Sequence, residues 1–142
     1  MTIDPSADWT RGPGPDAVFA QHLASGDFRI QHCAACGLHV FYPRLACSHC
    51  GSVALEWQAP SGRGTVYAVS VVNRSADKGG PYNVVLVDLA EGPRMMGRVD
   101  GVPPDTVRIG MAVRARVGQG AGGEPCVVFD PDAAADGARS AR

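Results

Sequence analysis

Two Cys-x-x-Cys pairs, each followed by glycine, constrain the fold of this chain most: CAACG begins at residue 33 and CSHCG at residue 47. Such a turn directs both of its sulfurs to one point, and the glycine can take the left-handed conformation that closes it. Two turns together supply the four thiolates of a tetrahedral zinc shell. The spacing therefore predicts a zinc ribbon over residues 28–60 with four metal ligands: Cys33, Cys36, Cys47 and Cys50.

The predicted metal is structural, because four cysteine ligands leave no open coordination position for a substrate. A redox dithiol would need one Cys-x-x-Cys beside a βαβ pattern, which the sequence lacks. The two Cys-x-x-Cys-Gly turns, called knuckles below, also resemble the iron-binding turns of rubredoxin. Whether the purified protein holds zinc or iron therefore stays open. His32, His39 and His49 adjoin the cysteines, and we expect them to face solvent or to hydrogen-bond the sulfurs.

Composition indicates one ordinary globular domain: 142 residues, 45% hydrophobic, with a formal net charge of −1. The sequence has no apolar run of membrane-spanning length and no basic-then-apolar order of a signal peptide at its start. We therefore expect a cytoplasmic protein with reduced thiols and without a disulfide framework.

Residues 1–27 are expected to form a flexible N-terminus and one short helix, with Asp16 as N-cap and Gly26 as the stop signal. A helix of about ten residues is marginal alone, so it must dock on this domain or on another chain. The apolar side chains that would make that contact are Val18, Phe19 and Leu23.

From Gly64 the hydrophobic residues recur with the two-residue period of strands. Residues 61–131 are therefore predicted to form a small barrel. On its first strand we expect Tyr67, Val69 and Val71 to share a face. A disordered tail should follow over 132–142. The five expected strands cover residues 64–74, 82–90, 94–100, 111–118 and 125–131.

The barrel half offers little for catalysis, because no histidine follows residue 50 and Lys78 is the one lysine. Cys126 lies in an apolar strand, which favours a buried core residue over a nucleophile. Between the knuckles, the segment VFYPR belongs to a ribbon with little interior. We expect one of Phe41 and Tyr42 to pack on the barrel and the other, with Arg44, to contact a partner.

The chain closely resembles the bacterial and archaeal proteins called domain of unknown function 35, over roughly residues 16–131. These proteins join a rubredoxin-like zinc ribbon to an OB-fold, and the four cysteines match the zinc ligands of the family. The resemblance rests on the order of CAACG, FYPR, CSHCG, SGRGTVYAVSVVNR, YNVVLVDLAEGPRMMGRV and VVFDP. It implies a mainly β fold made of a short helix, the ribbon and a five-stranded OB-fold barrel.

The resemblance also implies a function: a non-catalytic accessory subunit of an acyl-CoA enzyme complex. The implied partner is a thiolase-like protein (thiolase, retro-aldolase or C-acyltransferase) that makes or cleaves a carbon–carbon bond, or alternatively a MaoC-type hydratase. That partner would supply the catalytic residues, and a CoA thioester is a candidate ligand at the interface of the complex.

The alternative function is that of a module for single-stranded nucleic acid, which OB-folds hold with a basic groove and stacking aromatics. The barrel offers Tyr67, Tyr82 and Phe129 as candidate aromatics. Residues 61–120 carry eight basic and five acidic side chains, a weak excess for a nucleic-acid binder. The charge pattern therefore favours a protein partner.

Overall fold

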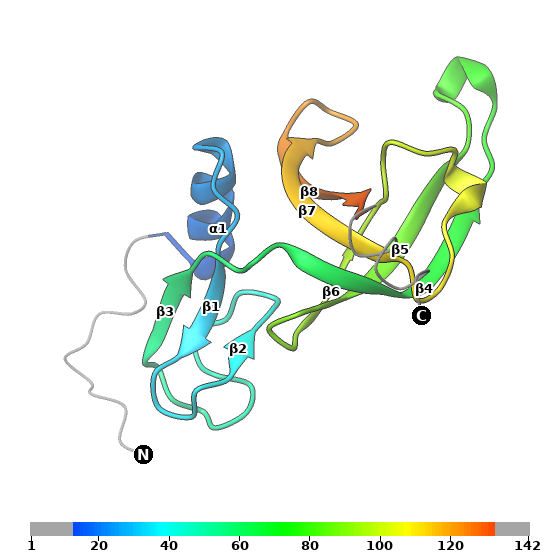
Figure 1. Cartoon of the computed structure of the whole chain (residues 1–142). Helices are drawn as coiled ribbons and strands as arrows, with labels where there is room; N and C mark the ends of the chain where they lie inside the picture. The colour runs from blue at the N-terminus through cyan, green and yellow to red at the C-terminus, as the bar shows by residue number, and fades with distance from the viewer. Residues whose placement is uncertain (1–12, 133–142) are drawn as a thin grey trace.

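A short helix, a three-stranded ribbon and a curled five-stranded barrel, with a linker between ribbon and barrel, make up the computed structural model (Figure 1). The structure describes residues 13–132, so the predicted flexibility of residues 1–12 and 133–142 lies outside the described residues. This architecture confirms the predicted mainly β fold. The elements are α1 (Pro15–Ala24), β1 (Ile30–Cys33), β2 (His39–Val40), β3 (Leu55–Gln58), β4 (Arg63–Val72), η1 (Ala76–Lys78), β5 (Tyr82–Leu89), β6 (Arg94–Gly97), η2 (Pro104–Thr106), β7 (Ala112–Gln119) and β8 (Pro125–Pro131).

Helix α1 begins differently from the prediction. The N-cap is Gly14 rather than Asp16, because Pro15 opens the helix and has no N–H to be capped. Asp16 lies in the first turn instead, where a carboxylate is favourable near the helix N-terminus. The helix ends as predicted, with Gly26 at a φ of 81°. Within residues 13–132, no helix has the length and apolarity needed to cross a membrane.

The barrel sheet has the strand order β6-β5-β4-β7-β8, and all of its neighbouring strands are antiparallel. It closes just after β6, where Val99 forms a parallel bridge to Phe129. The backbone N–H of Phe129 donates to the carbonyl of Arg98, and the N–H of Asp100 donates to the carbonyl of Phe129. Closure therefore depends on a close approach of β8 to the end of β6.

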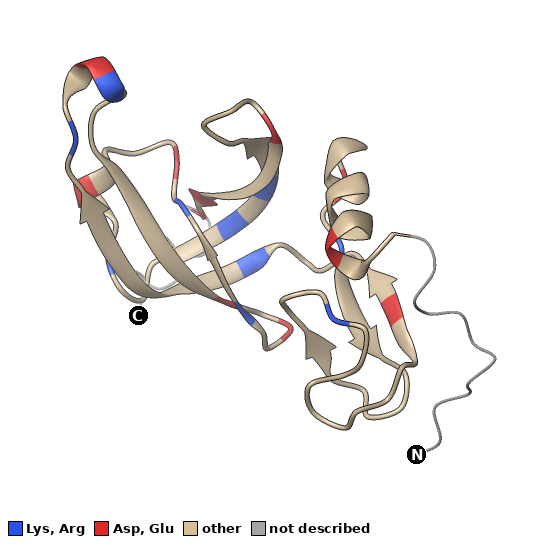
Figure 2. Cartoon of the chain, turned by 180° about the vertical axis from the view of Figure 1, so that it is seen from behind, with Lys and Arg blue, Asp and Glu red and all other residues tan. Residues whose placement is uncertain are grey.

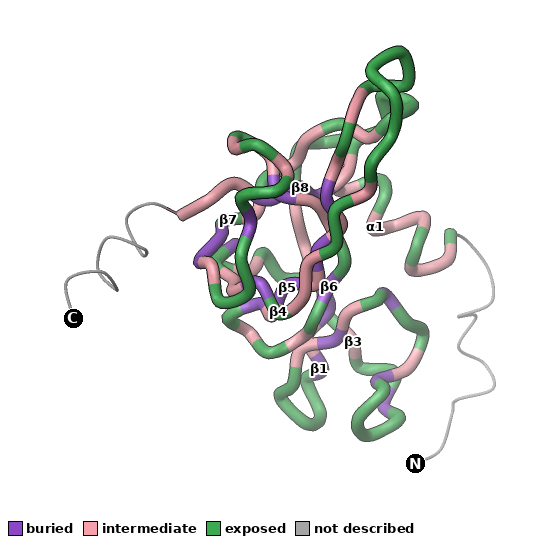
Figure 3. Tube along the Cα trace, turned by 90° about the vertical axis from the view of Figure 1, so that its right-hand side faces the viewer, coloured by how far each residue is buried: buried purple, intermediate pink, exposed green. Residues whose placement is uncertain are grey.

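One continuous core links the helix, the ribbon and the barrel. Leu23 of α1 and Ile30 of β1 belong to the same buried cluster as the barrel side chains Val66, Val85, Val87, Val113 and Phe129. The long β4–β5 loop instead stands away from this core, and Figure 3 shows it exposed along most of its length. The ribbon is thus packed onto the barrel through apolar side chains.

A β-bulge changes the side-chain pattern of β4. The pairing with β5 shifts between Val66 and Ala68, so Tyr67 is an extra residue on that strand. Tyr67 is 50% exposed, whereas Val69 packs against the core. The expected common face of Tyr67, Val69 and Val71 is therefore wrong, because an inserted residue reverses the alternation of side chains.

Gly97 provides a test of barrel closure. A Cβ at this position would lie 2.9 Å from Cε2 of the buried Phe129 ring, so Gly97→Ala should lower the free energy of unfolding by about 1–3 kcal/mol through overpacking. Urea denaturation followed by circular dichroism measures the change. The control is Gly122→Ala, where the added methyl would meet the movable end of the Glu124 side chain. Equal stability of the two variants would contradict this account of closure.

Candidate metal centre and contact surface

The two Cys-x-x-Cys knuckles repeat the same backbone geometry. In the first, the N–H of Gly37 donates to the carbonyl of Cys33 at 2.8 Å; in the second, the N–H of Gly51 donates to that of Cys47 at 2.9 Å. Both glycines have left-handed φ values, 78° and 77°, which favour glycine for lack of a Cβ. Each turn thus ends in a residue that can adopt the left-handed conformation. The two turns therefore hold their sulfurs in the same geometry.

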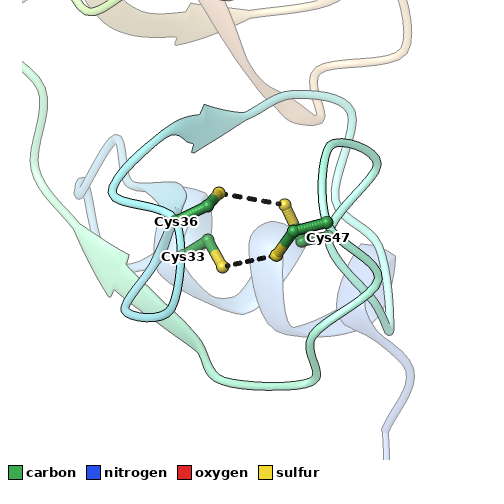
Figure 4. Close-up of side chains that lie close together, drawn as sticks. Cys33, Cys36 and Cys47 are labelled. Carbon is green, nitrogen blue, oxygen red and sulfur yellow. Dashed lines mark hydrogen bonds between the residues drawn. The ribbon is translucent and has the colours of Figure 1, made fainter. Parts of the chain in front are cut away.

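The four sulfurs gather at one point, within 4.8 Å of one another. The Sγ atoms of Cys33 and Cys50 are 3.6 Å apart. Those of Cys36 and Cys47 are 3.7 Å apart (Figure 4). A tetrahedron with zinc–sulfur bonds of about 2.3 Å has edges of about 3.8 Å. The thiol cluster therefore fits a tetrahedral metal ion.

Backbone N–H groups around the cluster favour thiolates, the form that binds metal. The N–H of Cys36 is the largest cause that lowers the pKa of Cys33, which falls to about 7. At Cys47 burial raises the pKa, but hydrogen bonds led by that from the His49 N–H outweigh it, and the pKa is lowered. The contact from the His49 N–H to the Cys47 sulfur measures 3.3 Å. The backbone of His49 thus makes the hydrogen bond to sulfur that we had expected of a histidine side chain.

The pKa values of the other two thiols are raised instead of lowered. The N–H of Ser52 lowers the pKa of Cys50, but burial and the neighbouring thiols outweigh it and raise the pKa to about 12. At Cys36 the Leu38 N–H lowers the pKa, but burial and the thiols of Cys33 and Cys47 outweigh it, and the pKa is raised. Four thiolates at this spacing repel one another, and a bound cation would remove that repulsion.

The ribbon has a very small core of its own. Its buried apolar cluster consists of Val40 and two of the cysteines, with Leu55 packed against them. His32 and His39 pair across β1 and β2, with ring centroids 4.8 Å apart. A metal ion would therefore contribute much of the folding free energy of the ribbon.

Phe19 lies at the centre of an aromatic cluster that attaches α1 to the ribbon. Its ring centroid is 5.6 Å from that of Phe41 and 6.5 Å from those of Phe28, Tyr42 and Trp57. Two of the three predicted contact residues of the helix, Phe19 and Leu23, thus contact this chain itself. Leu23 is buried in the core, while Val18 is half-buried.

The VFYPR segment divides as predicted into a covered ring and an exposed one. Phe41 packs against the main core, whereas Tyr42 is 55% exposed and Arg44 is exposed beside it. A clamp that sequence reasoning missed holds this segment. The buried amide of Gln31 donates to the Arg44 carbonyl at 2.8 Å and accepts from the Arg44 N–H at 2.7 Å. A glutamine inside a short strand gives no sign of a partner thirteen residues away.

Cys126 is not the buried core residue that its apolar strand predicts. It is partly buried and lines a cavity of about 870 Å³ together with Arg98, Met96 and Tyr82. Its neighbour Val127 points into the core cluster, and successive residues of a strand face opposite sides. Cys126 therefore faces away from the core.

Comparison with known proteins identifies both parts of the chain. A family model described as the ChsH2 rubredoxin-like zinc ribbon domain matches residues 20–56, and one described as the ChsH2 C-terminal OB-fold domain matches residues 57–118. A chain of a solved Ltp2-ChsH2(DUF35) aldolase superposes with a TM-score of 0.73 at 30% identity, over 84% of this chain and 96% of that one. This chain belongs to the DUF35 family. Its ribbon is a structural zinc site, and its barrel is an OB-fold.

Curated relatives of this DUF35 chain carry two kinds of name. A "DUF35 domain-containing scaffold protein" of Methanocaldococcus jannaschii is 36% identical over 87 residues, covering 58% of this chain and 62% of that protein. The "3-oxo-4,17-pregnadiene-20-carboxyl-CoA hydratase alpha subunit" of Mycobacterium tuberculosis is 35% identical over 116 residues, covering 80% of this chain and 37% of that protein. The chain thus spans less than two thirds of the length of each.

Removal of a single knuckle sulfur tests the metal centre. Cys36→Ser should lose the metal and unfold the ribbon, because structural zinc supplies on the order of 10–16 kcal/mol in comparable small sites. Elemental analysis of freshly purified, reduced protein measures the metal, and the fluorescence of Trp57 in β3 reports ribbon folding. Cys126→Ser, a thiol outside the cluster, should keep one zinc per chain. The assignment fails if the wild-type protein holds no metal.

Leu23 tests whether the helix belongs to the core. Leu23→Ala should lower the free energy of unfolding by about 2–4 kcal/mol, since it removes buried methyl groups and leaves a cavity. Leu45→Ala removes the same atoms from a side chain that is 49% exposed and should change stability by less than about 0.5 kcal/mol. Thermal denaturation compares the two. Equal melting temperatures would mean that α1 does not contribute to the core in solution.

Proposed function

We propose that this chain is a non-catalytic scaffolding subunit of a thiolase-like acyl-CoA enzyme that makes or cleaves a carbon–carbon bond. The observation that carries the proposal is the likeness to the solved Ltp2-ChsH2(DUF35) aldolase, which extends over 96% of the matched chain. The scaffold names of the archaeal relatives support it. The cytoplasm, as expected from the sequence, is the compartment of this assembly.

The distribution of reactive side chains supports an accessory role. Acyl-CoA chemistry needs a positioned base or nucleophile, and the sequence has no histidine after residue 50. Among the histidines of the described region, His32 and His39 pair with each other and His22 lies against Trp57. The partner subunit would therefore supply the catalytic groups, with a CoA thioester held at the shared interface.

In this assembly the ribbon presents one contact region and the zinc maintains it. The proposed zinc ligands are Cys33, Cys36, Cys47 and Cys50. The loop between the knuckles would bring Tyr42 and Arg44 to the partner, since Gln31 holds this loop in one conformation. The division of the chain into a ribbon over 28–60 and a barrel over 61–131 is part of the same proposal.

A hydratase is the second candidate partner. The Mycobacterium tuberculosis relative is named as a hydratase alpha subunit, and 63% of its length has no counterpart in this chain. A MaoC-type hydratase could thus take the place of the thiolase-like subunit. The identity of the subunit that binds the chain distinguishes the two candidates.

The geometry of the aromatic side chains argues against the nucleic-acid function. Phe129 is fully buried. The guanidinium of Arg94 lies 3.4 Å from the ring centroid of Tyr67, and that of Arg74 lies 4.6 Å from that of Tyr82. Phe129 is therefore out of reach, and a guanidinium already occupies one face of each tyrosine ring, whereas binding of single strands needs free aromatic faces.

The activity test uses the full chain with its natural partner. The tagged chain is expressed in its source organism, co-purified subunits are identified by mass spectrometry, and each is then produced alone. The chain alone should show no thiolase, aldolase, hydratase or thioesterase turnover. Mixed with the thiolase-like subunit, it should raise that subunit's activity or soluble yield severalfold. The accessory function is wrong if Cys126→Ala abolishes activity of the complex while assembly is unchanged.

A further inference from the structure

The outer side of the β4–β5–β6 sheet carries apolar side chains where an antiparallel sheet normally presents polar ones to water. Register places Ala68 of β4 opposite Leu86 of β5, and Leu86 opposite Met96 of β6. The flanking Val85, Val87 and Met95 point into the core, so this row faces outward. We refer to the following set as the outer apolar face: Tyr67, Ala68, Val84, Leu86 and Met96.

Two members of the outer apolar face are well exposed: Met96 at 67% and Tyr67 at 50%. A methionine side chain is flexible and polarisable, and it is over-used at binding surfaces. An exposed apolar area on a folded domain, with polar residues at its rim, is typical of a protein–protein contact. The outer apolar face therefore has the composition of an interface rather than of a solvated surface.

The other side of the same barrel provides an internal comparison. The exposed residues of β7 include Arg114 and Arg116. Figure 2 shows the positions of basic residues along the strands of the barrel in blue. Arg116 pairs with Asp130 at 2.6 Å, and Arg114 lies 4.0 Å from Asp132. The chain thus uses charged pairs on one outer side of its barrel and apolar side chains on the other.

The charges beside the outer apolar face neutralise each other. The guanidinium of Arg94 pairs with the Asp88 carboxylate at 2.6 Å, and this hydrogen bond raises the pKa of Arg94. The same guanidinium lies over the Tyr67 ring. This rim therefore offers no net charge for phosphates, and one face of its tyrosine ring is already occupied. What complements it is an apolar, uncharged protein surface.

We propose that the outer apolar face docks on an apolar, uncharged surface of the thiolase-like subunit, an inference that rests on the proposed function. Met96, the most exposed member of the outer apolar face, is the main anchor of this contact and inserts between partner side chains. Burial of a projecting apolar side chain at the centre of an interface is the arrangement in which single residues carry most of the affinity.

The experiment measures the dissociation constant between the full chain and the thiolase-like subunit identified by co-purification, using isothermal titration calorimetry. Met96→Asp should weaken binding by about tenfold or more, since it places a charge in an apolar contact. The matched control is Ile109→Asp, a 70% exposed side chain outside the outer apolar face, which should change the constant by less than about twofold. Melting temperatures verify folding, and Met96→Ser replaces Met96→Asp if the latter does not fold.

The outcomes separate this inference from the function on which it rests. If the wild-type chain binds the subunit and Met96→Asp binds equally well, the docking face is wrong and the scaffolding function stands. If no thiolase-like subunit binds the wild-type chain, the scaffolding function is overturned, and the docking proposal falls with it. A wild-type homodimer in sedimentation that Met96→Asp dissociates would assign the face to a second copy instead.

Discussion

The four-sulfur centre is the constraint on which the ribbon depends. Two of its cysteines, Cys33 and Cys47, are also two of the three buried members of the ribbon's own apolar cluster. The same residues would thus serve as ligands and as core, and a core so small cannot hold a fold by burial alone. A zinc ion would join two knuckles with the same hydrogen-bonding pattern, and the first of them begins at the end of β1, the strand that carries Gln31.

The ribbon and the barrel are connected by packing as well as by the chain. Leu23, Ile30 and Phe41 lie before the barrel in the sequence, yet all contribute to its core. Ser61 in the linker adds a polar tie, since its N–H donates to the Glu91 carboxylate at 3.0 Å. This construction would suit the proposed scaffolding function, because a partner that contacted both parts would meet surfaces already held together.

The barrel itself has two differently built outer sides. Arginine–aspartate pairs cover β7 and β8, and such exposed pairs contribute little to stability but keep a surface soluble. The β4–β5–β6 side instead presents Leu86 and Met96 in one row. Under the proposed scaffolding function a partner subunit would cover this side, and that would account for the difference between the two sides.

The sequence by itself determined the features that depend on neighbours in the chain. The spacing of the cysteines and the glycines after them predicted the zinc centre, and alternation predicted β7, where Val113 faces inward and Arg114 outward. Tertiary structure alone decided the rest, because contacts between distant residues depend on strand register. The bulge at Tyr67 reversed one predicted face, and the pairing of Leu86 with Met96 created the outer apolar face. Neither leaves a local signal, since an inserted residue and a cross-strand neighbour are defined only when the strands meet.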